Sequence, residues 1–271
     1  MPQPLFFNEI KYIPSFEVAM HRGLWSFVVL FISLTLFNGI KDFFLLFKFP
    51  KKIIILSITA LLIATNWLGF IYSVNIGKVQ DTSLGYFLTP MISISLGYLF
   101  LSEKLNFRKV ISVLLMFFSC LILVFSSDHF PYIAILIGTT WGVYGLLRKQ
   151  IQVPPALGLL FESGFITLFA LPYLVFIGVS ETSFFTYNLN YNSIMLFFTG
   201  IVTIIPLFLF NLSLKYIPLG LAGVLFYIAP SFHFITSVYV LGEYMNNYKF
   251  LAFMIIWIGV SIFIYDAIKK K

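Results

Sequence analysis

The sequence predicts an all-α protein, a polytopic bundle of transmembrane helices. Hydrophobic residues make up 60% of its 271 positions and charged residues only 10%, whereas an ordinary soluble domain is about 25% charged. The mean hydropathy is +0.99. A soluble domain of this size leaves about a quarter of its chain surface exposed, so it could not hide so much apolar surface. The composition therefore excludes a soluble enzyme, a secreted disulfide scaffold and a disordered protein.

Nine segments are apolar over about the 20 residues that a helix needs to cross a bilayer. Short polar or proline-containing turns separate them, and they lack the alternation of barrel strands. Residues 1–13 are apolar but too short to span, so we expect them to be the second half of a helix whose first half is absent. The nine predicted spans lie near 16–38, 52–76, 82–101, 108–126, 130–148, 155–178, 192–214, 219–241 and 248–267.

The sequence repeats itself at a shift of 140 residues: apolar runs align with apolar runs, and the alignment needs no gap. We therefore predict two five-helix copies, at 1–130 and 131–271, with the first helix incomplete. Because five is odd, tandem copies would enter the membrane in opposite senses and form an inverted repeat. The matching landmarks are Pro14 with Pro154, Pro90 with Pro230, Leu101 with Leu241, Glu103 with Glu243, Asn106 with Asn246, and Lys109 with Lys249.

The loop charges predict the orientation. The net charge is +7, and the 17 Lys and Arg residues cluster between apolar runs. One set of alternate helix ends holds thirteen of them, the other set holds three, and Arg22 lies within a span. The positive-inside rule places the richer set in the cytoplasm. We expect a multi-pass protein of the cell inner membrane with a cytoplasmic C-terminus, and no nucleic-acid partner. The richer set comprises 39–52, 102–109, 148–154, 215–218 and the C-terminal tail.

Two ionisable residues at membrane depth are the first site candidates, because burying a charge in lipid is costly. Arg22 lies about 10 Å into its helix at 1.5 Å per residue, and Glu162 is its counterpart at the 140-residue shift. Opposite charges at related depths would either form a structural ion pair or hold a zwitterionic cargo. We leave the two alternatives open.

Polar and aromatic residues in the matched helices complete the predicted site. Asn66 needs a helix partner or a cargo to satisfy its amide, and Tyr86 and Tyr227 share faces with Pro90 and Pro230. Proline within a membrane helix frees a carbonyl and bends the axis, which indicates either a hinge or a static kink. No nucleotide-binding loop, metal-ligand spacing or catalytic triad occurs in the sequence, so we expect no cofactor, no metal and no catalysis. The single Cys120 cannot form an intrachain disulfide.

Several short strings, in this order and spacing, resemble the drug/metabolite transporter superfamily, EamA type, and its RarD branch in particular. The strings are His21-Arg22 with Trp25-Ser26, Asn66-Trp67 with Asn75, Ser83-Leu84-Gly85-Tyr86-Phe87 ahead of Pro90, Gly200-Ile201-Val202-Thr203 ahead of Pro206-Leu207, and Tyr227-Ile228-Ala229-Pro230. The resemblance covers nearly the whole chain and implies a carrier of small metabolites with a central cavity. The chain departs from the family in lacking the first half of helix one, where a Trp-Gly pair is usual.

Together these observations predict a secondary transporter that moves a small organic metabolite or drug-like solute by alternating access. The alternatives are a membrane-embedded enzyme acting on lipid, and a non-transporting assembly or sensor subunit. A small-molecule substrate and the lipid bilayer are the expected partners, and a homodimer is left open. The predicted substrate-binding residues are Arg22, Asn66, Trp67, Tyr86, Glu162 and Tyr227, and the predicted bends are at Pro90, Pro206 and Pro230.

Overall fold

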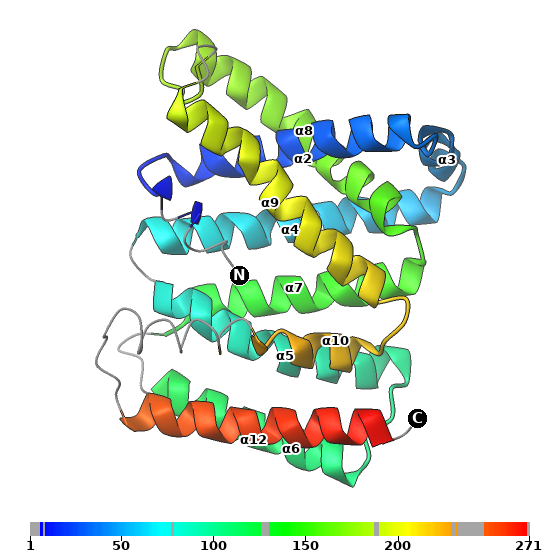
Figure 1. Ribbon diagram of the computed structural model, residues 1–271, viewed down its shortest axis with the longest axis vertical. Coiled ribbons are helices and arrows are strands. Elements are labelled where there is room, and N and C mark those ends of the chain that lie inside the picture. Colours follow the sequence, from blue (N-terminus) through cyan, green and yellow to red (C-terminus); the bar gives the residue numbers. More distant parts are fainter. Residues whose placement is uncertain are drawn as a thin grey trace. The chain divides into compact units, whose positions relative to one another are not determined.

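The computed structural model describes residues 6–7, 9–76, 79–125, 130–186, 190–228, 231 and 247–269. Every regular element in these ranges is a helix, so the predicted all-α class is confirmed. In chain order the elements are α2 (Ser15–Leu36), α3 (Ile40–Leu45), the 3-10 helix η1 (Leu46–Lys48), α4 (Pro50–Asn75), α5 (Val79–Leu101), α6 (Phe107–Phe125), α7 (Tyr132–Ile151), α8 (Pro155–Val179), α9 (Tyr191–Ser213), α10 (Leu219–Leu225) and α12 (Asn247–Lys269) (Figure 1).

Proline marks the start of several helices. Pro14, Pro154 and Pro218 directly precede α2, α8 and α10, and Pro50 is the first residue of α4. Proline fixes φ near the helical value and has no N–H to satisfy, so it suits the first turn. Beyond these starts the apolar runs become helices, because a helix satisfies its own backbone groups where no water is present.

Seven of the described helices are long and apolar enough to cross a membrane: α2, α4, α5, α6, α8, α9 and α12. The predicted count of nine spans is not confirmed. The segment predicted at 130–148 forms α7, but this helix is less apolar and its last turn carries Arg148 and Lys149. The segment predicted at 219–241 begins with α10, and much of the rest lies outside the described residues.

The chain folds into two compact units, and each takes helices from both halves of the sequence. Residues 78–146 and 217–271 form one, which we call the α6/α12 unit. Residues 2–77 and 147–216 form the other, the α2/α8 unit. The sequence repeats predicted at 1–130 and 131–271 therefore do not correspond to these units of contact, and their boundary stays a prediction.

In the α6/α12 unit, α6 and α12 pack along each other, and two repeat-related pairs of residues make equivalent contacts between them. The Ser119 hydroxyl donates to the Ala252 carbonyl at 2.6 Å. The repeat counterparts of these residues, Gly259 and Ser112, also meet, since a Cβ at Gly259 would lie 3.1 Å from the Ser112 carbonyl oxygen. In one contact α6 provides the small residue and α12 the carbonyl, and in the other these roles are reversed. Such an exchange is expected when two repeat-related helices run antiparallel about a local twofold axis.

The pairing of α5 with α10 in the same unit follows the same rule. The Tyr227 hydroxyl, just beyond α10, donates to the Phe87 carbonyl at 3.0 Å. Position 227 is the counterpart of position 87, and a residue that meets its own counterpart lies at the local axis. Pro90 lies within α5, as Pro206 lies within α9. Pro230 lies outside the described residues.

In the α2/α8 unit, α2 packs against α8 and α9, and α4 packs against α8. Phe16 near the start of α2 meets Tyr173 near the end of α8, with ring centroids 4.7 Å apart. Farther along α2, the ring of Phe27 lies 3.2 Å from where a Cβ of Gly164 would be. Residues later in α2 therefore contact residues earlier in α8. These repeat-related helices are also antiparallel, as an inverted repeat requires.

Candidate functional site

The structure places the six predicted site residues in two different units. Arg22, Asn66, Trp67 and Glu162 belong to the α2/α8 unit. Tyr86 and Tyr227 belong to the α6/α12 unit. The candidate site described next is the polar cluster of the α2/α8 unit.

Arg22 lies on α2, and its side chain is surrounded by hydroxyl and aromatic groups. It is only 6% exposed. Its Nε donates to the Thr203 hydroxyl on α9 at 2.5 Å. Its guanidinium carbon lies 4.4 Å from the centroid of the Trp67 ring and 5.1 Å from that of Phe7. A desolvated cation over an indole face is stabilised by about 2 kcal/mol, so Trp67 holds Arg22 electrostatically as well as by packing.

Glu162 lies on α8 at the counterpart position, and it is 2% exposed. Its Oε1 accepts a hydrogen bond of 2.6 Å from the Thr59 hydroxyl on α4. The same oxygen lies 3.6 Å from the Nε of Arg148. Arg22 and Glu162 therefore make related contacts, each with a threonine on a neighbouring helix, although their charges are opposite.

Arg148 is a site residue that the sequence analysis missed, because it was counted among loop cations. It lies instead in the last turn of α7 and is 4% exposed. Besides Glu162, its Nε donates to the side-chain oxygen of Asn211 on α9 at 2.7 Å. Its guanidinium lies against Gly158 on α8, where a Cβ would be only 1.8 Å from Nη1. The glycine at position 158 was the one feature of the sequence that could have indicated this close approach of Arg148 to α8.

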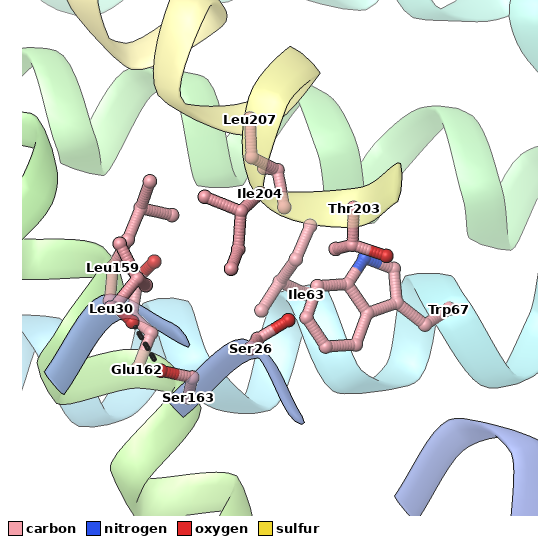
Figure 2. A pocket seen from close by; sticks show the side chains of 10 residues that line it. All are labelled: Ser26, Leu30, Ile63, Trp67, Leu159, Glu162, Ser163, Thr203, Ile204 and Leu207. Carbon is pink, nitrogen blue, oxygen red and sulfur yellow. Dashed lines mark hydrogen bonds between the residues drawn. The ribbon is translucent and has the colours of Figure 1, made fainter. Parts of the chain in front are cut away.

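A small cavity lies beside this cluster (Figure 2). Its lining residues include Glu162, Trp67, Ser26, Ser163 and Thr203, and the wall is mostly apolar. The remaining lining side chains are aliphatic. The space at its centre suffices for about one water molecule. This conformation is therefore closed to a metabolite at this cavity. The aliphatic lining residues are Leu30, Ile63, Leu159, Ile204 and Leu207.

Trp67, which lines the cavity, has a buried indole N–H. The side chain is 5% exposed, and its Nε1 has no hydrogen-bond partner within the described residues. Asn66, the preceding residue on α4, is also buried, at 7% exposure. A buried indole N–H usually finds a partner.

The tyrosines of the other unit differ in burial. Tyr227 is 1% exposed, and its hydroxyl is bonded to the Phe87 carbonyl. Tyr86 is half-buried on α5. The local contacts of Tyr227 are thus those of a packing residue at the repeat axis, and a role in substrate binding stays a prediction for both.

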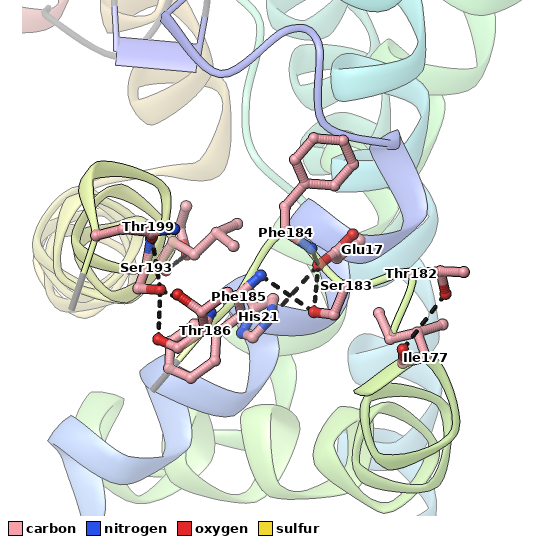
Figure 3. A network of polar contacts seen from close by, with 12 residues as sticks. Glu17, His21, Ile177, Thr182, Ser183, Phe184, Phe185, Thr186, Ser193 and Thr199 are labelled. Carbon is pink, nitrogen blue, oxygen red and sulfur yellow. Dashed lines mark hydrogen bonds and ion pairs between the residues drawn. The ribbon is translucent and has the colours of Figure 1, made fainter. Parts of the chain in front are cut away.

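A second polar network joins α2 to the loop between α8 and α9 (Figure 3). Glu17 is 1% exposed, and its Oε1 accepts hydrogen bonds of 2.8 Å from the Ser183 hydroxyl and from the Phe184 backbone N–H. His21, one turn along α2, lies 4.0 Å from the same oxygen and stacks on the Phe185 ring. These contacts fix the loop against α2, which gives Glu17 a structural role.

Comparisons with known proteins agree with this architecture. The EamA-like transporter family matches residues 5–125 and 131–265. The chain is similar to Protein RarD of Salmonella typhi, 34% identical over 265 residues that cover 98% of this chain and 90% of that protein. It is also similar to an uncharacterized transporter of Vibrio cholerae (34% over 266 residues, 98% and 88% covered) and to the uncharacterized transporter YojE of Bacillus subtilis (33% over 271 residues, 99% and 90% covered).

A solved structure described as "Crystal structure of protein" covers 99% of this chain and 96% of its own, with a TM-score of 0.68 and 16% identity. At that identity the likeness concerns the fold alone. The family match covers most of the chain, and the relatives exceed 30% identity over nearly all of it. This multi-pass membrane protein therefore belongs to the EamA-like transporter family and is a RarD-like membrane transporter.

Proposed function

We propose that the chain carries a small organic solute across the membrane by alternating access, and that Arg22, Asn66, Trp67 and Glu162 contribute to its binding site. The observation that carries this proposal is the pair of buried, oppositely charged side chains at one cavity. Glu162 lines the cavity directly, and Arg22 is bonded to Thr203 and stacked on Trp67, which also line it. Charges at this depth are costly and are usually functional.

The composition of the cavity wall suggests the kind of solute. The mostly apolar wall favours a solute with an apolar body, and Glu162, one of the lining residues, favours a polar or charged group on it. Because the space holds only about one water molecule, binding of a metabolite requires the surrounding helices to separate. Alternating access supplies such a change when repeat-related elements rock about a fixed site.

The proposal includes the orientation expected from the loop charges: residence in the inner membrane with the C-terminus in the cytoplasm. It also keeps the sequence-based repeats at 1–130 and 131–271 as the elements that exchange roles between the two states. Cysteine accessibility scanning of the loops and of the C-terminal tail in intact cells tests the orientation. Labelling of the tail by a membrane-impermeant maleimide from outside would contradict it.

The function is tested with the full chain in proteoliposomes and a panel of labelled solutes that combine an apolar body with one or two charged groups. We expect saturable uptake of at least one solute above that of protein-free liposomes. Arg22→Gln and Glu162→Gln should lower the uptake per amount of folded protein, whereas Lys215→Gln, which removes an exposed charge of the same unit, should leave it unchanged.

Two outcomes would count against the proposal. Normal uptake by both Arg22→Gln and Glu162→Gln would remove these residues from the site. Absence of uptake across the panel, together with turnover of the liposome lipid, would favour the alternative of a membrane-embedded enzyme. Light scattering of the purified chain measures the oligomeric state independently and tests the homodimer.

A further inference from the structure

Three cationic side chains gather at one end of the α6/α12 pair. Because the two helices are antiparallel, the first turn of α6 and the last turn of α12 lie at the same end. The guanidinium carbon of Arg108 and the Nζ of Lys269 each lie 5.8 Å from the centroid of the Tyr265 ring. The Nζ of Lys109 lies 5.2 Å from the centroid of the Phe263 ring. Both helices are long and apolar enough to cross the membrane, so this end lies at a headgroup layer.

The neighbouring acids form no ion pair with these cations among the described residues. Asp266 is 3% exposed, and its Oδ1 accepts a 2.6 Å hydrogen bond from the Asn106 side chain. Glu103 accepts hydrogen bonds from two backbone N–H groups at the start of α10. Within the described part of the chain, Arg108 and Lys269 contact the Tyr265 ring and no carboxylate. The three cations of the cluster are therefore not held by a direct ion pair in the described part of the chain.

The internal repeat indicates that packing of α6 against α12 does not require Arg108. At the 140-residue shift, the counterpart of Arg108 is Tyr248, at the start of α12, whereas Lys109 matches another cation, Lys249. A topology bias would explain an excess of cations on one side of the membrane. Such a bias would not by itself place two cations, Arg108 and Lys269, over the one exposed ring of Tyr265.

The surface beside the cluster suits lipid. Tyr265 is 57% exposed and Phe107 is 79% exposed, as is usual for aromatic residues at a membrane interface. Below them on α6, Val110, Leu114 and Phe118 follow one another at helical spacing and are 40%, 49% and 56% exposed. Positive charge at the end of an apolar, outward-facing stripe matches an anionic headgroup with its acyl chains.

We propose that the α6/α12 end formed by Arg108, Lys109 and Lys269 binds the headgroup of an anionic phospholipid. Arg108 can engage phosphate oxygens in a bidentate manner, and the lysines add point charges. The N-terminus of α6 adds partial positive charge at the same place. The exposed stripe of α6 takes the acyl chains. These three residues belong to the α6/α12 unit, whereas the cavity belongs to the α2/α8 unit, and the inference does not depend on the proposed function.

The test compares two lipids with identical acyl chains, palmitoyl-oleoyl phosphatidylglycerol and palmitoyl-oleoyl phosphatidylcholine, added to the purified full chain in detergent and measured by native mass spectrometry. We expect tighter retention of phosphatidylglycerol. Arg108→Gln with Lys269→Gln should weaken its retention roughly 30-fold, from the usual contribution of each cation near anionic lipid. Arg108→Lys keeps the charge without the bidentate geometry and should give an intermediate loss.

The control is Lys51→Gln with Lys52→Gln at the start of α4, which removes the same charge from another helix end where Lys52 also lies over an aromatic ring. This control should retain phosphatidylglycerol as the parent chain does. Equal retention of the two lipids by the parent chain, or an equal loss in the control, would overturn the proposal. Displacement of the lipid by inorganic phosphate alone would also overturn it. Unchanged thermal unfolding of the double variant in phosphatidylcholine excludes a general loss of structure.

Discussion

The buried ion pair between Arg148 and Glu162 gives the sharpest prediction. Both side chains are nearly inaccessible, at 4% and 2% exposure, and the charged atoms lie 3.6 Å apart. At an effective dielectric constant of about 20, two unit charges at that distance attract by about 4–5 kcal/mol. The attraction offsets the cost of removing both charges from water, so the pair as a whole contributes little net stability. Loss of one partner leaves the other charge uncompensated.

Arg148→Met should therefore lower the free energy of unfolding by about 3–5 kcal/mol, and Glu162→Gln should do the same. In Arg148→Met with Glu162→Gln both charges are gone. We expect the double variant to lose roughly 2–3 kcal/mol less than the sum of the two single losses, at the upper end of measured coupling energies. Equilibrium unfolding of the four proteins in mixed micelles measures the cycle.

Lys149→Met provides a matched control, because it removes a positive charge from the adjacent residue of α7. Lys149 is only partly buried, and its Nζ donates to the Leu214 carbonyl at 2.9 Å. We expect it to cost about 1 kcal/mol, as for an ordinary hydrogen bond. If the losses at Arg148 and Glu162 were additive, or if Arg148→Met cost no more than the control, the view that the two charges depend on each other would be wrong.

Two further substitutions separate packing from function. Gly158→Ala places a Cβ 1.8 Å from the Arg148 Nη1 atom and should displace the guanidinium and destabilise the fold, whereas Gly178→Ala on the same helix meets nothing within 4 Å and should be neutral or slightly stabilising in thermal unfolding. Equal effects of the two alanines would show that the close approach is not a constraint. Tyr227→Phe removes the hydrogen bond to a backbone carbonyl and should cost about 0.6–2 kcal/mol. Unchanged stability with lost uptake would instead place the hydroxyl on the substrate path.

Helix positions were predictable because the solvent is uniform along each span. In hydrocarbon an apolar run has no alternative to the helix, so composition and length suffice. The prediction of helix ends was less accurate where a helix carries charged residues in its last turn. α7 has Arg148 and Lys149 in its last turn, and the pattern indicated a loop there. Whether such a residue extends outward into water or folds inward depends on what the neighbouring helices offer, and a hydropathy pattern does not contain that information.

The candidate site was predicted in part for a similar reason. Depth along a helix follows from counting residues, so Arg22 and Glu162 could be singled out as buried charges. Their partners could not, because Thr203 is 181 residues from Arg22 and Thr59 is 103 residues from Glu162. The partner of a buried charge is set by which helices cross at that depth. Arg148, only 14 residues from Glu162 in the sequence, was assigned to the wrong environment altogether.

The amino-acid sequence alone determined that this protein is a helical membrane protein, because the bilayer admits few backbone structures, and the repeat in the order of its residues predicted two related halves. The tertiary structure decided that each compact unit combines helices of both halves, that Glu162 is paired with Arg148, and that the cavity between Trp67 and Glu162 is closed. These features depend on side-chain contacts between segments far apart in the chain. Such contacts are specified by three-dimensional packing and leave no local pattern.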